Sequence, residues 1–319
     1  MVSLDEATFG PMTELLRRDL LLHCYRFTGS FTDAEDLVQE TMVKAWRGRA
    51  AFRGEAGLRT WLRRIATHVC LDALRRDRAR RTLPSGEGEG AAREVLWLDP
   101  LPDEVLADSE SDPAARYDLR ESVSLAFLAA LQRLPPRQRA VLILRDVLAL
   151  RASEVADQLE VSVSAVTSLL HRARRTLRAR YTRPATSRPP DIETSELLRR
   201  YLRAWESGNV DGLLAILKHD ARLEMPPIPS ASIGHAAIRA FLAGTILDGT
   251  PGRWRCVTTE ANGGPAVALY EREAGSYRFA GLQLLAVDAA EIIAITAYMD
   301  RALATRFHMP AELPARPNA

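Results

Sequence analysis

Basic side chains gather at the end of the segment Arg151–Arg180. His171 lies beside them, and residues 172–183 hold six arginines and no acidic residue. Guanidinium groups bind phosphates and can pair with guanine in the major groove, so this run suggests nucleic-acid binding. A second basic block, residues 59–81, carries eight arginines against two aspartates. The chain therefore has two segments with the chemistry of a nucleic-acid surface.

The first basic run has a pattern that would present it on a helix. We expect a short helix over Ala152–Leu159, a tight turn, and a longer helix from about Ser164. Small or apolar residues stand where two such helices would cross: Ala156, Val161, Val166 and Leu169. Glu160 occupies the turn, where glycine would be easiest, so some strain is expected there. The pattern favours a helix-turn-helix over a hairpin with a solvated basic face.

Charge is sorted along the chain, although the net charge is only +2. Residues 87–121 hold eleven acidic residues and three arginines, between the two basic blocks. Such a segment avoids nucleic acid or imitates it. The three cysteines lie far apart, which indicates neither a zinc site nor a disulfide framework. No apolar run is long enough to span a membrane, and no export signal is evident. We expect a cytoplasmic protein without metal or cofactor.

Helical patterns dominate the first 181 residues. Residues 12–80 are expected to be helical, with Thr32 and Glu35 at capping-box spacing. An amphipathic helix is predicted over residues 58–74. Residues 82–115 lose this periodicity and collect Gly, Pro, Ser and acids, which predicts an extended linker. Helices resume near Arg116.

The last part of the chain has a different periodicity. After a proline-rich linker over 182–191, helices are predicted at Leu198–Trp205, Val210–Lys218 and His235–Leu247. Four strand-like runs follow: Arg253–Glu260, Ala266–Glu273, Tyr277–Val287 and Glu291–Asp300. Helices followed by antiparallel strands indicate an α+β domain.

Two sets of motifs resemble the extracytoplasmic-function (ECF) sigma factors of bacterial RNA polymerase. Asp33–Glu40 and Arg59–Ala66 resemble sigma region two. Leu134–Arg139, the helix-turn-helix and Leu170–Arg174 resemble region four. The resemblance implies two all-α sigma domains, region two over residues 10–81 and region four over 116–183, joined by an acidic linker over 82–115.

The resemblance also implies partners and contacts for region two. Its acidic helix binds the β′ clamp coiled coil of core RNA polymerase, and the matching residues are Asp36, Gln39 and Glu40, which suit charge-assisted hydrogen bonds. An ordinary solvated helix face remains the alternative. The family also captures flipped bases of the minus-ten element. The matching candidates for DNA contact are Arg53, Arg59, Arg63, Arg64, His68, Arg75 and Arg76. Trp61 lies on the apolar stripe and is expected in the core.

Region four of the family binds the β flap of the polymerase and the minus-35 element of promoter DNA. The matching candidates for DNA contact are Ser164, Thr167, Ser168, His171, Arg172 and Arg175. Many relatives carry Lys and Arg where this chain has Thr167 and Leu169, which leaves the promoter sequence open. The acidic linker resembles the sigma linker that approaches the polymerase active site, with a disordered tether as the alternative.

Residues 192–307 resemble the SnoaL-like branch of the NTF2-like superfamily, in which helices back a curved sheet that forms a cone. A tail is expected over 308–319. The resemblance implies a regulatory or ligand-sensing domain, whose pocket could take an unknown small ligand. Because the connection that contains Pro189, Pro190 and Asp191 is short, we also expect the domain to pack against the sigma domains or their linker. The candidate pocket residues are Trp205, Glu224, Tyr270, Tyr298 and Asp300. No nucleophile–base pair or metal spacing is visible, so we expect no enzyme.

Two alternatives remain at the level of the sequence. The first is a stand-alone helix-turn-helix regulator with a ligand-sensing domain, which leaves residues 33–76 without a purpose. The second is a SnoaL-like enzyme fused to a DNA-binding domain.

Overall fold

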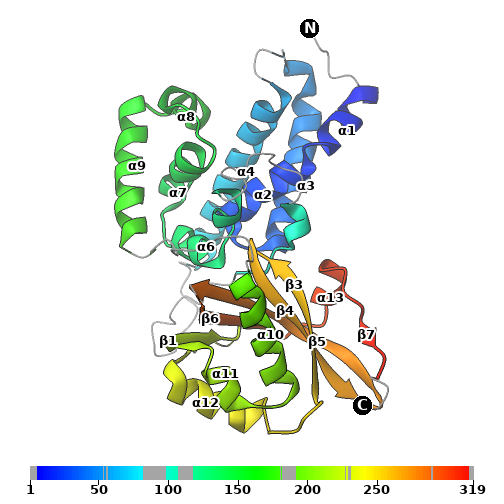
Figure 1. Cartoon of the computed structure of the whole chain (residues 1–319). Helices are drawn as coiled ribbons and strands as arrows, with labels where there is room; N and C mark the ends of the chain where they lie inside the picture. The colour runs from blue at the N-terminus through cyan, green and yellow to red at the C-terminus, as the bar shows by residue number, and fades with distance from the viewer. Residues whose placement is uncertain are drawn as a thin grey trace. The chain divides into compact units, whose positions relative to one another are not determined.

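The computed structural model divides into two compact units (Figure 1), one formed by Met1–Leu101 with Glu121–Thr182, the other by Pro102–Arg120 with Arg183–Ala319. Each unit is described by itself. The structure describes residues 6–52, 54, 57–81, 98–106, 118–179, 181, 192–226, 228, 231–288 and 290–315. In this part of the chain, no helix combines the length and apolar character that crossing a bilayer requires.

Four helices form a first helical module: α1 (Glu6–Glu14), α2 (Arg17–Thr28), α3 (Phe31–Gly48) and α4 (Leu58–Arg81). They bury Leu20, Tyr25, Phe27 and Leu62 completely. The capping box predicted at Thr32 and Glu35 is wrong. The cap is Ser30, whose Oγ accepts the Asp33 N–H at 3.2 Å, because the helix begins two residues earlier than expected.

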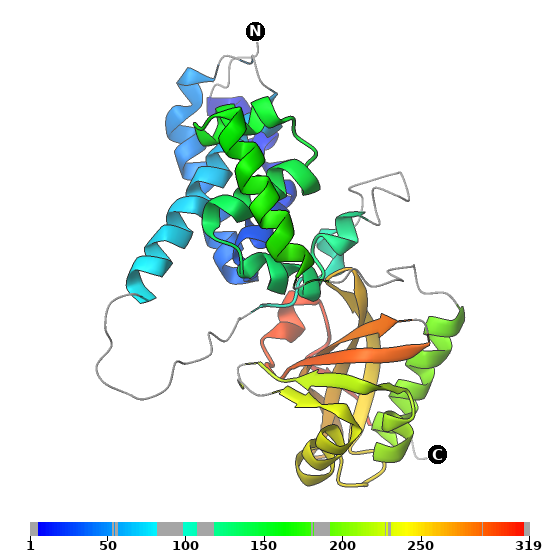
Figure 2. The ribbon, with the colours of Figure 1, turned by 90° about the vertical axis from the view of Figure 1, so that its left-hand side faces the viewer.

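The remaining helices of this unit form a second helical module: α6 (Leu125–Gln132), α7 (Pro136–Leu142), a π-helical turn (Ile143–Val147), α8 (Ala152–Leu159) and α9 (Val163–Arg178). Figure 2 turns α9 towards the viewer. Val141, Val155, Val166 and Leu170 make a shared apolar core. Glu160 has the left-handed φ of 54° that the turn imposes. The predicted helix-turn-helix is therefore present, with α8 at the expected residues.

The second unit is a sheet domain. Its helices are α10 (Ile192–Glu206), α11 (Val210–Leu214), α12 (Gly234–Thr245) and α13 (Leu303–Arg306). Its strands are β1 (Leu217–Glu224), β2 (Ala231–Ile233), β3 (Trp254–Ala261), β4 (Gly264–Glu273), β5 (Ser276–Asp288), β6 (Glu291–Tyr298) and β7 (Glu312–Leu313). The order is β2-β1-β6-β5-β4-β3, with β7 beside β5. Among the described strands only the β1–β6 pair is parallel, so the sheet is mixed.

Three expectations for the sheet domain are corrected. The helix predicted to reach Lys218 ends at Leu214, because β1 begins at Leu217 and pairs with β6. The strands β1 and β2 were not predicted. The tail expected over 308–319 contains β7, which pairs with β5 at Tyr277 and Arg278.

Helix α10 supplies the centre of the sheet domain's core. Tyr201 and Trp205 are almost fully buried, and the Tyr201 hydroxyl donates to Gln283 Oε1 on β5 at 2.6 Å. Trp205 meets Trp254 of β3 edge to face, with ring centroids 5.9 Å apart. Aromatic pairs of this geometry stabilise a core beyond their buried area. The face of the sheet that carries Trp254 is therefore covered by helices and filled with aromatic side chains.

The segment from Pro102 is folded onto the turn between β3 and β4. Pro102 forms an isolated bridge with Ala261, and Asp103 Oδ1 accepts the Gly263 N–H at 2.7 Å. Arg120 lies 3.4 Å from Glu260. This part of the predicted linker is thus not a featureless tether, and the expected packing of the C-terminal domain against the linker is present. Residues 82–97 and 107–117 lie outside the described residues.

The contact between Asp103 and the β3–β4 turn should depend on pH. Burial, aided by nearby Glu260 and opposed by the Gly263 N–H and Arg120, raises the pKa of Asp103 from 3.8 to about 6. The state in which Asp103 contacts the turn therefore binds a proton more tightly than the state in which Asp103 is released to solvent. The contact is strongest below about pH 4 and weakens as the pH rises through 6, by roughly 1–3 kcal/mol.

Asp103→Asn keeps the acceptor for the Gly263 N–H and removes the titration. We expect the variant to protect this amide better than the wild type at pH 7.5 and equally at pH 4.5. Amide exchange, corrected for intrinsic rates, measures it, with Glu104→Gln on the exposed neighbour as control. Equal pH dependence in wild type and Asp103→Asn would contradict this account.

Candidate nucleic-acid interface and polymerase-binding surface

The outer side of α9 gathers all six residues predicted for its DNA contacts. Each is exposed, and their spacing of three or four residues places them on one side of the helix: Ser164, Thr167, Ser168, His171, Arg172 and Arg175. The opposite side buries Val166, Leu170 and Ala173. A helix with its apolar side in a core and its basic side in solvent can enter the major groove.

An ion pair fixes α9 to the π-helical turn. The Arg174 guanidinium donates two hydrogen bonds to the Asp146 carboxylate, at 2.9 and 2.7 Å. The hydrogen bond to Asp146 raises the pKa of Arg174. Arg174 thus belongs to the frame of the module, whereas Arg172 and Arg175 face solvent. Sequence reasoning missed Asp146, because the pair joins residues 28 positions apart and follows no local pattern.

Helix α4 presents most of the arginines predicted for the minus-ten surface. Their exposed fractions are 62% for Arg59, 49% for Arg64, 55% for Arg75 and 59% for Arg76. The ion pairs that three of them make, with Glu160, Asp72 and Glu40, are exposed and therefore weak, so a phosphate can replace the carboxylate.

Three residues predicted for the same surface differ from this set. Arg63 is only 22% exposed and makes a two-pronged ion pair with Asp19 of α2, so it ties α4 to α2. His68 is half-buried, and Arg53 lies outside the described residues. Trp61, expected in the core, is half-buried against Phe52, with ring centroids 5.1 Å apart.

The three residues predicted to bind polymerase lie on one side of α3. Asp36 and Gln39 are exposed, and Glu40 is partly exposed. Glu40 pairs with Lys44 at 2.9 Å and with Arg76 at 3.4 Å. The Lys44 hydrogen bond, helped by the charges of Lys44 and Arg76, lowers the pKa of Glu40. The side of α3 that carries Asp36, Gln39 and Glu40, called the α3 stripe below, is therefore anionic at neutral pH and suits a basic partner surface.

Comparisons with known proteins identify all three parts. Models of Sigma-70 region 2, Sigma-70 region 4 and the SnoaL-like domain match residues 12–81, 124–177 and 198–305. The ECF RNA polymerase sigma factor SigG of Mycobacterium tuberculosis is 44% identical over 318 residues, covering 96% of this chain and 85% of SigG. The chain belongs to the ECF sigma factors of RNA polymerase.

SigJ of the same organism is 29% identical over 83% of this chain and 79% of SigJ. The crystal structure of the M. tuberculosis ECF sigma factor SigJ has the same fold, with a TM-score of 0.62, 23% identity, and coverage of 93% of this chain and 98% of that one. As an ECF sigma factor, the protein binds RNA polymerase and directs promoter-specific initiation. Its first and second helical modules are regions two and four, and its sheet domain is SnoaL-like.

The candidate pocket residues of the sheet domain are divided between the two faces of the sheet. Trp205 lies in the core under α10, in contact with Trp254. Leu269 of β4 belongs to that core, so its neighbour Tyr270 points to the opposite face of the sheet, against Phe279.

Strand pairing places Glu224 and Tyr298 on the same face of the sheet as Tyr270. Glu224 lies opposite Thr296, two residues before Tyr298, and Tyr298 lies opposite Leu282, whose other partner Ala268 stands two residues before Tyr270. Tyr298 is buried at the end of β6. Glu224 is partly exposed and paired with Arg222, and Asp300 is exposed and accepts the Ala302 N–H. The five residues therefore do not all lie on one face, and a pocket formed by those on the Tyr270 face stays a prediction.

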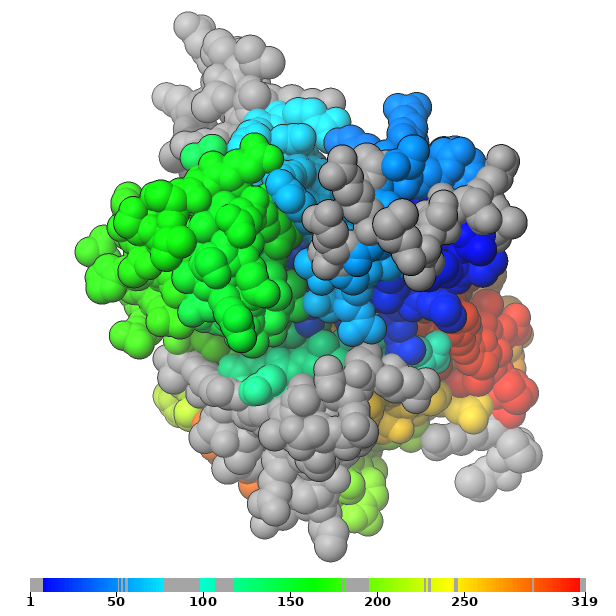
Figure 3. All heavy atoms as spheres, turned by 90° about the horizontal axis from the view of Figure 1, so that it is seen from above, coloured from blue at the N-terminus to red at the C-terminus, as the bar shows by residue number. Residues whose placement is uncertain are grey.

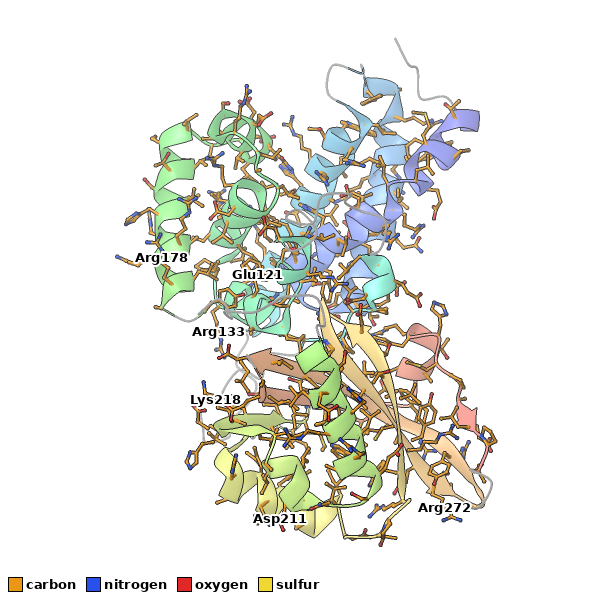
Figure 4. The ribbon with its side chains drawn as sticks, viewed as in Figure 1. Glu121, Arg133, Arg178, Asp211, Lys218 and Arg272 are labelled. Atoms are coloured by element: carbon orange, nitrogen blue, oxygen red, sulfur yellow. The ribbon has the colours of Figure 1, made fainter. Side chains whose placement is uncertain are left out.

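Truncation of the exposed arginines of α9 should weaken promoter binding. Arg172→Ala and Arg175→Ala each remove a cation from the groove-facing side, so we expect affinity to fall about tenfold and the salt slope to fall by about one. Fluorescence anisotropy of a promoter fragment, titrated with core polymerase carrying each variant at several salt concentrations, measures both. The control is Arg133→Ala, an exposed arginine outside α9 (Figure 4). An unchanged affinity and slope in the α9 variants would refute the assignment.

Proposed function

We propose that this sigma factor contacts core polymerase through the α3 stripe and reads the promoter through α4 and α9. Asp36, Gln39 and Glu40 would bind the β′ clamp coiled coil, and the second helical module would meet the β flap. The loop before α4 and the helix itself would bind the minus-ten element, and α9 the minus-35 element. The proteins of this family act on polymerase in the cytoplasm, and we place this chain there.

The observation that carries this proposal is the sorting of charge between helices. The α3 stripe is acidic and exposed, while α4 and α9 present arginines to solvent. An acidic stripe cannot serve a phosphate backbone, and arginine rows suit one. One chain thus has separate surfaces of opposite charge for a protein partner and for DNA.

We also propose that the SnoaL-like domain regulates the factor through its contact with the linker, and that this domain has no enzymatic activity. The support is the contact of Pro102, Asp103 and Arg120 with the β3–β4 turn. Trp205 packs on the other face of the sheet from Tyr270, Tyr298 and Glu224, which argues against one catalytic constellation of these residues.

Charge reversal on α3 should impair polymerase binding. Asp36→Arg places a cation where the partner is expected to be basic, so we predict at least tenfold weaker binding to core polymerase. Asp220→Arg on β1 makes the same charge change on an exposed residue of the sheet domain, which is not proposed to bind polymerase. Biolayer interferometry with immobilised core polymerase compares the two. If both variants bind like the wild type, α3 is not the docking helix.

A change at the β3–β4 turn should alter transcription without altering polymerase binding. Gly263 has φ 76°, and a Cβ added there would lie 2.7 Å from the Cβ of Arg120, so Gly263→Ala should push Arg120 away and loosen the contact between the turn and the segment Pro102–Arg120. We expect run-off transcript yield to change at least threefold at saturating factor. Gly275→Ala strains a turn at φ 93° with open space around it and serves as control. Equal yields from the three proteins would remove the support for regulation through the linker.

A further inference from the structure

The first two turns of α9 carry no charged side chain. Residues 163–170 contain no Arg, Lys, Asp or Glu, whereas residues 171–178 contain four arginines. The commonest specific contact in the major groove joins Arg or Lys to guanine. In a helix-turn-helix, the residues that reach base edges lie at the N-terminal end of the second helix. The base-reading end of α9 therefore lacks the usual contact to guanine, and its arginines lie beyond that end.

An apolar side chain stands at this end of α9 instead. Val163 is the first residue of the helix and is 47% exposed. Among the described residues of the second helical module, no other large apolar side chain is as exposed. One exposed valine is ordinary on a protein surface. This one lies one helical turn from the exposed Thr167, so two side chains with methyl groups share one edge of the helix. In Figure 3 the atoms of α8 and α9, coloured green, lie at the surface of the module.

The hydroxyl of Thr167 is used inside the helix. Its Oγ1 donates a hydrogen bond to the Val163 carbonyl at 3.1 Å. The hydroxyl proton is therefore already bonded, and the γ-methyl group is left for a contact outside the helix. The γ-methyl groups of Val163 and Thr167 thus form a small apolar patch at the start of α9.

The cap and the core fix the backbone that carries this patch. Ser162 caps α9, and its Oγ accepts the Ala165 N–H at 3.2 Å and lies 2.9 Å from the Ser164 hydroxyl oxygen. On the other side of the helix, Val166 and Leu170 belong to the core that α9 shares with α7 and α8. Because side chains on a well-supported helix are held in a defined direction, the patch is suited to selecting one base over another.

The 5-methyl group of thymine is the apolar feature of the major groove, where the other bases present hydrogen-bond donors and acceptors. We propose that Val163 and Thr167 determine part of the promoter specificity by contacting the 5-methyl group of a thymine in the minus-35 element. This inference rests on the proposed binding of α9 to that element. It adds the base that the start of α9 selects and the atoms through which it does so.

Replacing thymine by deoxyuridine tests the contact, because it removes the 5-methyl group and keeps every hydrogen-bonding group of the base pair. Each thymine in the minus-35 element of a promoter found by run-off transcription is replaced in turn. Fluorescence anisotropy then measures how core polymerase carrying the full-length chain binds each duplex. At one position or more we expect about fourfold weaker binding, the effect of losing one buried methyl-sized group. Deoxyuridine in the spacer between the two promoter elements is the control and should leave binding unchanged.

Variants of α9 identify the protein side of the contact. Val163→Ala removes both γ-methyl groups of the valine, and Thr167→Ser removes the γ-methyl group while keeping the hydroxyl. The chain with both substitutions should bind the thymine and deoxyuridine duplexes equally, because the methyl group of the base has lost its partner. Ile233→Ala shortens an exposed apolar side chain of the sheet domain and should keep the full penalty for deoxyuridine. Both α9 positions are exposed, and thermal unfolding verifies that the variants are folded.

Three results would overturn the proposal: a minus-35 element made only of G·C pairs, binding that no deoxyuridine weakens, or a penalty that the double variant keeps in full. Failure of the proposed function gives a different result, since Arg172→Ala and Arg175→Ala then leave promoter affinity unchanged. If those arginine variants weaken binding and deoxyuridine does not, α9 binds the promoter and the thymine contact alone is wrong.

Discussion

The helical unit depends on polar groups that are buried between its two modules and hydrogen-bonded there. Thr67 of α4 is hydrogen-bonded to His23 of α2 and to Gln158 of α8, and Arg139 crosses from α7 to a carbonyl of α2. His23, in contact with Thr67, is kept neutral because burial, with the nearby charges of Arg63 and Arg26, lowers its pKa to about 3. Removing one partner of such a buried hydrogen bond leaves the other unsatisfied and costs about 1–3 kcal/mol of stability.

Acidic and basic side chains are also separated onto different helices of this unit. Acidic residues gather on α3 and in the linker, and arginines gather on α4 and α9. Within the free protein some of these charges satisfy each other, as Arg64 and Arg76 do with Glu160 and Glu40. These exposed pairs are weak, so stronger partners can displace them. The same side chains can thus form ion pairs within the free protein and contacts with polymerase and DNA in the complex.

Much of the helical part was predictable because its signals are local. The pattern of α8 and α9 gave the helix-turn-helix, and Glu160 has the left-handed turn that its position suggested. The side of α9 that faces solvent follows from helical spacing alone. The contacts of Arg174 with Asp146 and of Gln158 with Thr67 were not predictable, since they join distant residues that no local periodicity relates.

The sheet domain shows where local signals mislead. The helix predicted over Val210–Lys218 extends over the first two residues of β1, because the pairing of β1 with β6 is remote in sequence and leaves no local signal. The candidate pocket residues were chosen by type, whereas strand alternation decides which face each side chain occupies. The folding of Pro102–Leu106 was hidden within an acidic, proline-containing segment whose composition resembles a tether.

Promoter-specific initiation is the central claim, and run-off transcription tests it most directly. Core polymerase, alone or with the full-length chain, is given genomic promoter fragments and nucleotides. The account predicts discrete transcripts from a small set of fragments only when the chain is present. No specific transcript in either reaction, together with tight and selective DNA binding by the chain alone, would contradict it and favour a stand-alone regulator.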